Sequence, residues 1–177
     1  MVITRPTQVR MSGDIDVVDA RRRAFEAASK VCDPEIPVLS IGDLGVLRNV
    51  EVDGRGGVEV DITPTYSGCP AMNMIALELE LALEQAGFDK IKVRTVLAPA
   101  WTTEWLTEEG RRKLREYGIA PPSKSKGRGG LFGMDEVQCP RCGSNSTSRI
   151  AEFGSTSCKA LWRCEDCREP FDYFKCH

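Results

Sequence analysis

Cys139-Pro140-Arg141-Cys142 and Cys164-Glu165-Asp166-Cys167 are the stretches that decide the fold of the C-terminal part of the chain. Each is a Cys-x-x-Cys pair, in which one tight turn brings two thiolates close together. Two such pairs at this spacing are typical of a tetrahedral site with four thiolate ligands. We therefore predict that residues 135–177 fold around one metal ion. The predicted ligands are Cys139, Cys142, Cys164 and Cys167.

Zinc is the predicted ion, because four thiolates without a nearby histidine suit Zn²⁺, and iron in a mononuclear four-thiolate site is the alternative. The site is predicted to be structural, since a closed shell of four thiolates leaves no coordination position for chemistry and so short a module forms a poor core. Segments with strand character at 147–153, 158–163 and 171–174 would build a β-ribbon. Cys158 and Cys176 are left over, and we interpret them as buried structural thiols, with a swapped or fifth ligand as the alternative.

Charge and composition exclude several classes of protein. The 177 residues include 24 Lys+Arg and 26 Asp+Glu, which give a net charge of -2. The chain therefore lacks the excess of positive charge that is typical of proteins that bind nucleic acid. No apolar run is long enough to span a membrane, and the N-terminus lacks the apolar core of a signal peptide, which predicts a cytoplasmic protein. The single histidine is the last residue, His177. An internal histidine for acid–base catalysis is therefore excluded, as is a Ser-His-Asp or Cys-His arrangement unless the terminus folds back into a site.

Hydrophobic periodicity predicts an α+β fold for the N-terminal part, with elements in the order α-β-β-α-β followed by a third, short helix. The expected elements are a helix at 14–31, a hairpin at 46–63, a helix at 71–87, a strand at 91–97 and a short helix at 107–117 with Thr107 as its N-cap. A stretch rich in Pro, Ser, Lys and Gly then indicates a flexible linker. The predicted organisation is a loose arm at 1–13, an α+β domain at 14–118, a linker at 119–134 and a β-rich four-cysteine zinc-ribbon module at 135–177.

The loop Thr63-Pro64-Thr65-Tyr66-Ser67-Gly68-Cys69-Pro70 is the second stretch with chemical character. It runs from a predicted strand into the predicted helix at 71–87, so we expect Cys69 at the helix N-cap or next to it. Free amides and the helix dipole at such a position stabilise a thiolate and lower its pKa, as in reactive or metal-binding cysteines. The alternative is an apolar cysteine that packs the turn.

The loop Asp33-Pro34-Glu35-Ile36-Pro37 places two carboxylates on a stiff extended segment after the first predicted helix. Asp33 and Glu35 are candidates for holding a metal beside Cys69 or for binding a partner. The alternative is that these residues only end the helix and that their charges are solvated.

Three segments together resemble the metal–sulfur cluster assembly domain, the type shared by SufT and the eukaryotic cytosolic iron–sulfur targeting factor. They are Asp33-Pro-Glu-Ile-Pro, Ile41-Gly-Asp-Leu-Gly and Thr63-Pro-Thr-Tyr-Ser-Gly-Cys69-Pro-Ala. The resemblance spans roughly residues 14–98. It implies a role in iron–sulfur cluster assembly or delivery, in which Cys69 is the functional thiol.

The whole chain resembles a narrower family, the D components of phenylacetyl-CoA epoxidase systems. The segments that carry this resemblance are Cys139-Pro-Arg-Cys142-Gly-Ser, Glu152-Phe-Gly-Ser-Thr-Ser-Cys158-Lys-Ala-Leu-Trp-Arg-Cys164 and Cys167-Arg-Glu-Pro-Phe-Asp-Tyr-Phe-Lys-Cys176. The family implies bacterial aerobic phenylacetate degradation, where a di-iron oxygenase epoxidises the ring of phenylacetyl-CoA. A reductase with flavin and a two-iron, two-sulfur cluster supplies the electrons. The implied role is assembly or delivery of an iron or iron–sulfur centre to one of these components.

The resemblance implies that the partners are the oxygenase or reductase components, with no nucleic acid or membrane, and a homo-oligomer is compatible with it. In this interpretation Cys69, with Asp33 and Glu35, transiently holds iron or an iron–sulfur cluster while the ribbon docks the client protein. Two alternatives stay open. One is a stoichiometric structural or docking subunit without metal delivery. The other is a redox enzyme in which Cys32 resolves an oxidised Cys69.

Overall fold

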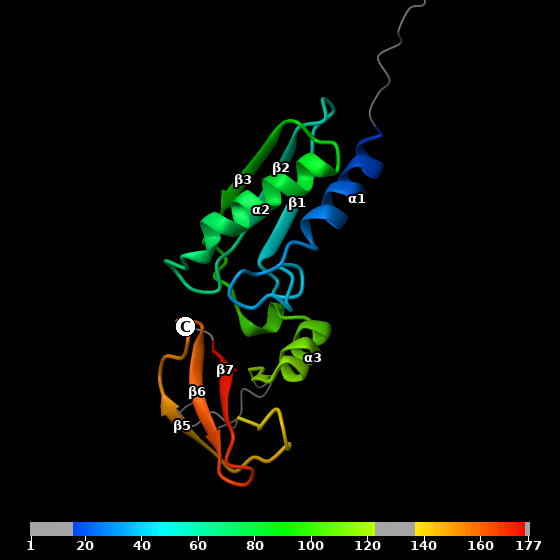
Figure 1. The fold of residues 1–177 in the computed structure, drawn as a ribbon. Helices are drawn as coiled ribbons and strands as arrows, with labels where there is room; N and C mark the ends of the chain where they lie inside the picture. The colour runs from blue at the N-terminus through cyan, green and yellow to red at the C-terminus, as the bar shows by residue number, and fades with distance from the viewer. Residues whose placement is uncertain (1–15, 123–136, 176–177) are drawn as a thin grey trace, which may run out of the picture.

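The computed structural model describes residues 16–122 and 137–175, and Figure 1 shows their arrangement. An α+β domain comes first, a short helix follows, and a small β-sheet module completes the chain, which confirms the predicted fold class. The predicted arm at 1–13, most of the predicted linker and Cys176 lie outside the described residues.

A three-stranded sheet forms the centre of the N-terminal domain. Its strands are β1 (Leu47–Val52), β2 (Val58–Ile62) and β3 (Ile91–Thr95). β1 and β2 form the predicted antiparallel hairpin, and β3 lies parallel to β2. Side chains of β2 alternate between full and partial burial, as expected for a sheet with one covered face. On the open face, Glu59 and Asp61 pair with Lys92 and Arg94 at 3.0 and 2.8 Å.

Two helices cover the other face of this sheet and lie against each other (Figure 1). They are α1 (Val17–Ala28) and α2 (Ala71–Gln85). Asp16 caps α1 by accepting amide hydrogen bonds from Val18 and Asp19. The periodicity correctly placed both helices, because small or aliphatic residues at three- and four-residue steps face the sheet. No helix among residues 16–122 and 137–175 is long and apolar enough to cross a membrane.

One apolar surface of α2 stays outside the core. Ile75, Leu79 and Leu83 are buried against the sheet, whereas other apolar residues of the helix are about half exposed. The exposed ones are Met74, Leu77 and Leu81. Helical periodicity predicts that these three widen the buried stripe, but they lie on the side of α2 that faces away from the sheet.

A short segment connects the N-terminal domain with the β-module. It holds the 3-10 turn η1 (Thr103–Trp105) and helix α3 (Glu108–Tyr117). Thr107 is the N-cap of α3 and accepts the amide of Gly110 at 2.9 Å, as the sequence predicted. Gly118 ends the helix with a left-handed φ of 90°, a conformation that glycine adopts without strain.

The C-terminal module is a four-stranded sheet with the order β4-β7-β6-β5. Its strands are β4 (Ile119–Ala120), β5 (Thr147–Ala151), β6 (Lys159–Cys164) and β7 (Pro170–Phe174). β5, β6 and β7 form the predicted antiparallel ribbon, whereas β4 lies parallel to β7 at its edge. Since β4 falls in the predicted flexible linker 119–134, that prediction is wrong for Ile119 and Ala120. Two residues are too few to show a strand period in the sequence.

The ribbon and the N-terminal domain share apolar contacts. The rings of Phe174 and Trp101 meet edge to face with their centroids 6.1 Å apart. Trp101 also donates its indole N–H to the Leu44 carbonyl at 2.8 Å, which fixes the ring in the N-terminal domain. Phe174 and Cys158 belong to the same buried cluster as the residues between the N-terminal sheet and its helices. The two parts therefore pack as one elongated molecule (Figure 1).

An ion pair ties α3 to the loop before β1. Lys113 Nζ donates to Asp43 Oδ2 at 2.7 Å, and the amide and hydroxyl of Ser40 donate to the same oxygen at 3.0 Å. Burial alone would raise the pKa of Asp43, but these hydrogen bonds outweigh it and hold the pKa below its ordinary value of 3.8.

We expect Asp43→Asn to lower the free energy of unfolding at neutral pH by about 1–3 kcal/mol, because charged hydrogen bonds are lost. A carboxyl whose pKa is lower in the folded state stabilises the fold fully above 3.8 and loses this effect as the pH falls through the folded value. Urea unfolding of both proteins from neutral to acid pH tests this. The difference between them should shrink in acid, and Glu109→Gln on the exposed side of α3 should show little effect. A difference that does not change with pH would contradict the prediction.

Candidate metal and thiol sites

The four paired cysteines come together at one end of the ribbon. Their Sγ atoms all lie within 4.8 Å of one another. Cys139 and Cys167 are 3.8 Å apart and Cys142 and Cys164 are 3.5 Å apart, sulfur to sulfur. Four sulfurs at about 2.3 Å from a central ion in tetrahedral geometry would be about 3.8 Å apart. The four sulfurs are therefore close enough together to bind one tetrahedral metal ion.

The two turns that carry these cysteines have the geometry of metal-binding knuckles. In the first, the amide of Gly143 donates to the Cys139 carbonyl at 3.0 Å, and Gly143 adopts a left-handed φ of 75°. In the second, the amides of Cys167 and Asp166 donate to the sulfur of Cys164 and lower its pKa. Amide donors at a sulfur favour the thiolate form, which is the form that binds metal.

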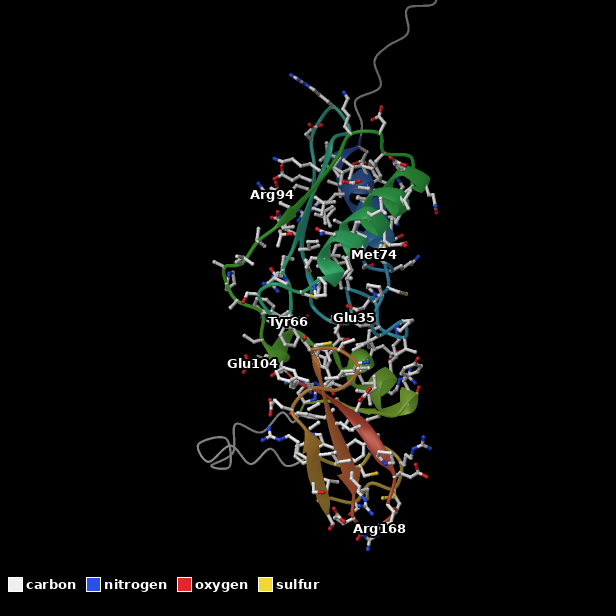
Figure 2. The ribbon with its side chains drawn as sticks, turned by 60° about the vertical axis from the view of Figure 1, so that its left-hand side comes forward. Glu35, Tyr66, Met74, Arg94, Glu104 and Arg168 are labelled. Carbon is white, nitrogen blue, oxygen red and sulfur yellow. The ribbon has the colours of Figure 1, made fainter. Side chains whose placement is uncertain are left out.

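This site lies far from the N-terminal domain. Arg168, next to Cys167, is at the free tip of the ribbon in Figure 2, whereas Glu35 and Tyr66 lie at the end of the N-terminal domain that faces the ribbon. Cys158 directly precedes β6 and Cys164 ends it. A strand of this length spans about 20 Å. Cys158 therefore does not share an ion with the four paired cysteines, which rules out the fifth-ligand alternative for this residue.

Cys69 lies on the loop between β2 and α2, close to the predicted position. Pro70 is the N-cap of α2, so Cys69 is the residue before the cap. Gly68 has a left-handed φ of 88°, and the Cys69 amide donates to the Tyr66 carbonyl at 3.3 Å, which closes the turn. The Ala71 amide donates to the sulfur of Cys69, as expected for a thiol at a helix N-terminus.

The pKa of Cys69 is raised, and our prediction of a lowered value is wrong. Burial has the largest effect and disfavours the thiolate. The negative charges of Glu35 and Asp33 act in the same direction. Hydrogen bonds from the Ala71 amide and the Tyr66 side chain oppose them without reversing the result. Cys69 is thus a half-buried thiol beside two carboxylates, and its raised pKa disfavours the thiolate that either a metal ion or an electrophile would need.

Asp33 and Glu35 have different roles in their loop. Asp33 Oδ1 accepts the amides of Glu35 and Ile36, each at 2.8 Å, and thereby shapes the turn. Burial raises the pKa of Asp33 despite these bonds. Glu35 instead points out of the loop, and its Oε2 accepts a hydrogen bond from Cys158 Sγ at 3.3 Å. Asp33 therefore shapes the turn after α1, which itself ends at Ala28, and Glu35 contacts Cys158 of the ribbon.

The sequence patterns did not predict that Cys158 belongs to a binding site. This cysteine is buried at the end of the ribbon that faces the N-terminal domain, and Thr156 Oγ1 lies 3.0 Å from its sulfur. Burial raises its pKa to about 12, and the nearby Glu35 and Asp33 charges add to this effect. The only signal in the sequence was that Cys158 belongs to neither Cys-x-x-Cys pair.

Comparisons with known proteins agree with this architecture. Residues 21–96 match the family described as iron–sulfur cluster assembly protein, and residues 123–175 match the family described as PaaD zinc beta ribbon domain. An Escherichia coli protein described as the D component of a 1,2-phenylacetyl-CoA epoxidase is 53% identical over 148 residues, which are 84% of this chain and 88% of that protein. The chain belongs to the family of phenylacetyl-CoA epoxidase D components.

Other relatives match about half of this chain. A Porphyromonas gingivalis protein described as an Fe-S protein maturation auxiliary factor is 35% identical over 85 residues, 48% of this chain and 80% of that protein. A crystal structure of a domain of unknown function from Bacillus anthracis covers 55% of this chain and 92% of its own, with a TM-score of 0.52 and 23% identity. The latter shows a common fold.

We expect Cys164→Ser to lose the bound metal and the fold of the ribbon, because the binding free energy of such a site is folding free energy. The helices of the N-terminal domain should persist, since they pack on their own sheet. Elemental analysis and circular dichroism measure the two effects. Cys32→Ser, which changes an exposed cysteine outside both sites, is the matched control. Full metal content in the Cys164 variant would contradict this assignment of ligands.

Proposed function

We propose that this protein is a maturation component of a phenylacetyl-CoA epoxidase system, which assists assembly or delivery of an iron or iron–sulfur centre to the oxygenase or the reductase. The observation that carries the proposal is the position of Cys69. It is a half-buried thiol at the start of α2, inside a domain of the iron–sulfur cluster assembly family, and it lies beside the carboxylates Asp33 and Glu35.

The chemistry of these groups supports transient metal binding. Thiolates and carboxylates together bind Fe²⁺, and a site with few fixed ligands releases its ion more readily than a closed four-thiolate shell. We propose that the four-cysteine site, in contrast, holds zinc as a permanent structural ion. Its four sulfurs fill the coordination shell and leave no position for a substrate or a client ligand.

The chain lacks the groups that oxygenase chemistry would need. A di-iron site of the carboxylate type takes histidine ligands as well as glutamates, and the sequence has one histidine at its last position. A dinucleotide-binding fingerprint is also missing from the sequence. These features support an accessory role beside the catalytic components of the system.

A second function, that of a stoichiometric docking component, is favoured by one observation. Met74, Leu77 and Leu81 form an exposed apolar strip along α2. Strips of this kind often mark contacts with another protein. The two functions make different predictions for the client: a maturation factor changes its iron content, whereas a docking component changes only its activity.

We expect Cys69→Ser to reduce the iron or cluster content of the client while this protein itself remains folded, because serine keeps the size of the side chain but binds iron poorly. The oxygenase and reductase would be purified from cells that carry the parent, the Cys69→Ser variant or the Cys32→Ser control. Iron, labile sulfide and epoxidase activity would be measured on each. Full iron content with the Cys69 variant would contradict the maturation function. Full iron content with low activity would support the docking function.

A further inference from the structure

We propose that Cys158 of the ribbon, Cys69 and Glu35 form one composite site that binds a divalent iron ion at the boundary between the two domains. This inference rests on the proposed function and adds a second thiol, Cys158, to the proposed metal-binding site. The ribbon would then contribute a ligand to this metal site and not only dock the client protein.

The contact between Cys158 and Glu35 is the first support. The Cys158 sulfur donates to Glu35 Oε2 at 3.3 Å, although the two residues are 123 positions apart in the sequence. Cys158 is only 5% exposed, and its neighbour Lys159 contributes a positive charge that acts on Asp33. The ribbon therefore brings a thiol to Glu35. This carboxylate lies at the end of the N-terminal domain that faces the ribbon (Figure 2).

Tyr66 provides the second support, because its side chain hydrogen-bonds to both parts of the site. One partner is Cys69 and the other is Ser157, the residue before Cys158. The carboxylates of Glu35 and Asp33 act electrostatically on Cys69 and on Cys158 alike. Both thiols therefore border the same carboxylates, although they come from different domains.

The ligand set suits a transient ion. Two thiols and one carboxylate match the donors of Fe²⁺ and Zn²⁺, and three protein ligands leave a position open for a client ligand. Within the described residues, the four paired cysteines are the one set of three or more such groups whose ligand atoms all lie within 4.8 Å. The ligand atoms of Cys69, Glu35 and Cys158 therefore do not all lie within 4.8 Å of one another, and binding of an ion requires their side chains to rotate toward a common centre. Both thiols lose their protons to solvent in that step, without any change of oxidation state.

Cobalt(II) is the probe that distinguishes this site from the four-cysteine site. Full-length protein with zinc in the ribbon would be titrated with Co²⁺ under anaerobic conditions. Because Zn²⁺ binds thiolate sites more tightly than Co²⁺, the ribbon ion should stay in place. We expect one additional Co²⁺ per chain, with a thiolate-to-cobalt charge-transfer band in the near ultraviolet.

Single substitutions test each ligand. Cys69→Ser and Cys158→Ser should each weaken Co²⁺ binding by about ten- to a hundredfold and roughly halve the charge-transfer intensity per bound ion. Glu35→Gln should weaken binding with the intensity unchanged, since it removes an oxygen ligand. Cys32→Ser should bind like the parent. Zinc content and thermal unfolding of every variant would show that the ribbon is folded, and Cys158→Ala would repeat the test with a different side chain.

The outcomes separate this inference from the proposed function. Cobalt binding that is unaffected in the folded Cys158 variants would overturn the composite site, even if Cys69→Ser lowers the iron content of the client. Binding that needs both thiols would support the composite site, even if the client proves to contain full iron without this protein. In that case the maturation function fails and the metal site remains.

Discussion

A small β-sheet cannot bury enough apolar surface to be stable by itself. The C-terminal sheet is stabilised by further interactions at both of its ends. At one end four cysteine sulfurs lie within 4.8 Å of one another. At the other end Phe174 and Cys158 enter the buried cluster of the N-terminal domain, and Trp101 fixes this contact through its hydrogen bond to Leu44. The placement of Cys158 beside Glu35 therefore depends on the metal-binding turns and on the shared core together.

The two groups of candidate metal ligands at the ends of the ribbon differ in how the fold holds them. Each knuckle turn fixes two sulfurs within a few residues, so the ligands of the four-cysteine set are held close by local backbone structure. Cys69, Glu35 and Cys158 come from three separate loops, and only tertiary packing brings them near one another. A locally fixed set favours a permanent ion, whereas a set assembled by packing can open and release its ion.

Local sequence patterns were sufficient to predict much of this structure. The Cys-x-x-Cys pairs, the hairpin of β1 and β2 and the cap of α3 at Thr107 each depend on neighbours in the sequence, and the structure has all three. The errors concern non-local effects. The pKa of Cys69 was predicted from the helix terminus alone, but burial and carboxylates from another loop decide it. Likewise β4 exists only because β7 lies beside it, and no local pattern reveals the contact of Cys158 with Glu35.

A site divided between two domains couples metal affinity to the packing of those domains. An ion that binds only when the ribbon is docked stabilises the docked arrangement, and by the same thermodynamic linkage any weakening of the docking lowers the affinity for the ion. A client that binds to the surface around Tyr66 and Ser157 and weakens the docking of the ribbon would therefore lower the affinity for the ion. In the proposed carrier function, the ribbon would stay folded through an ion bound by its four cysteines while the composite site fills and empties.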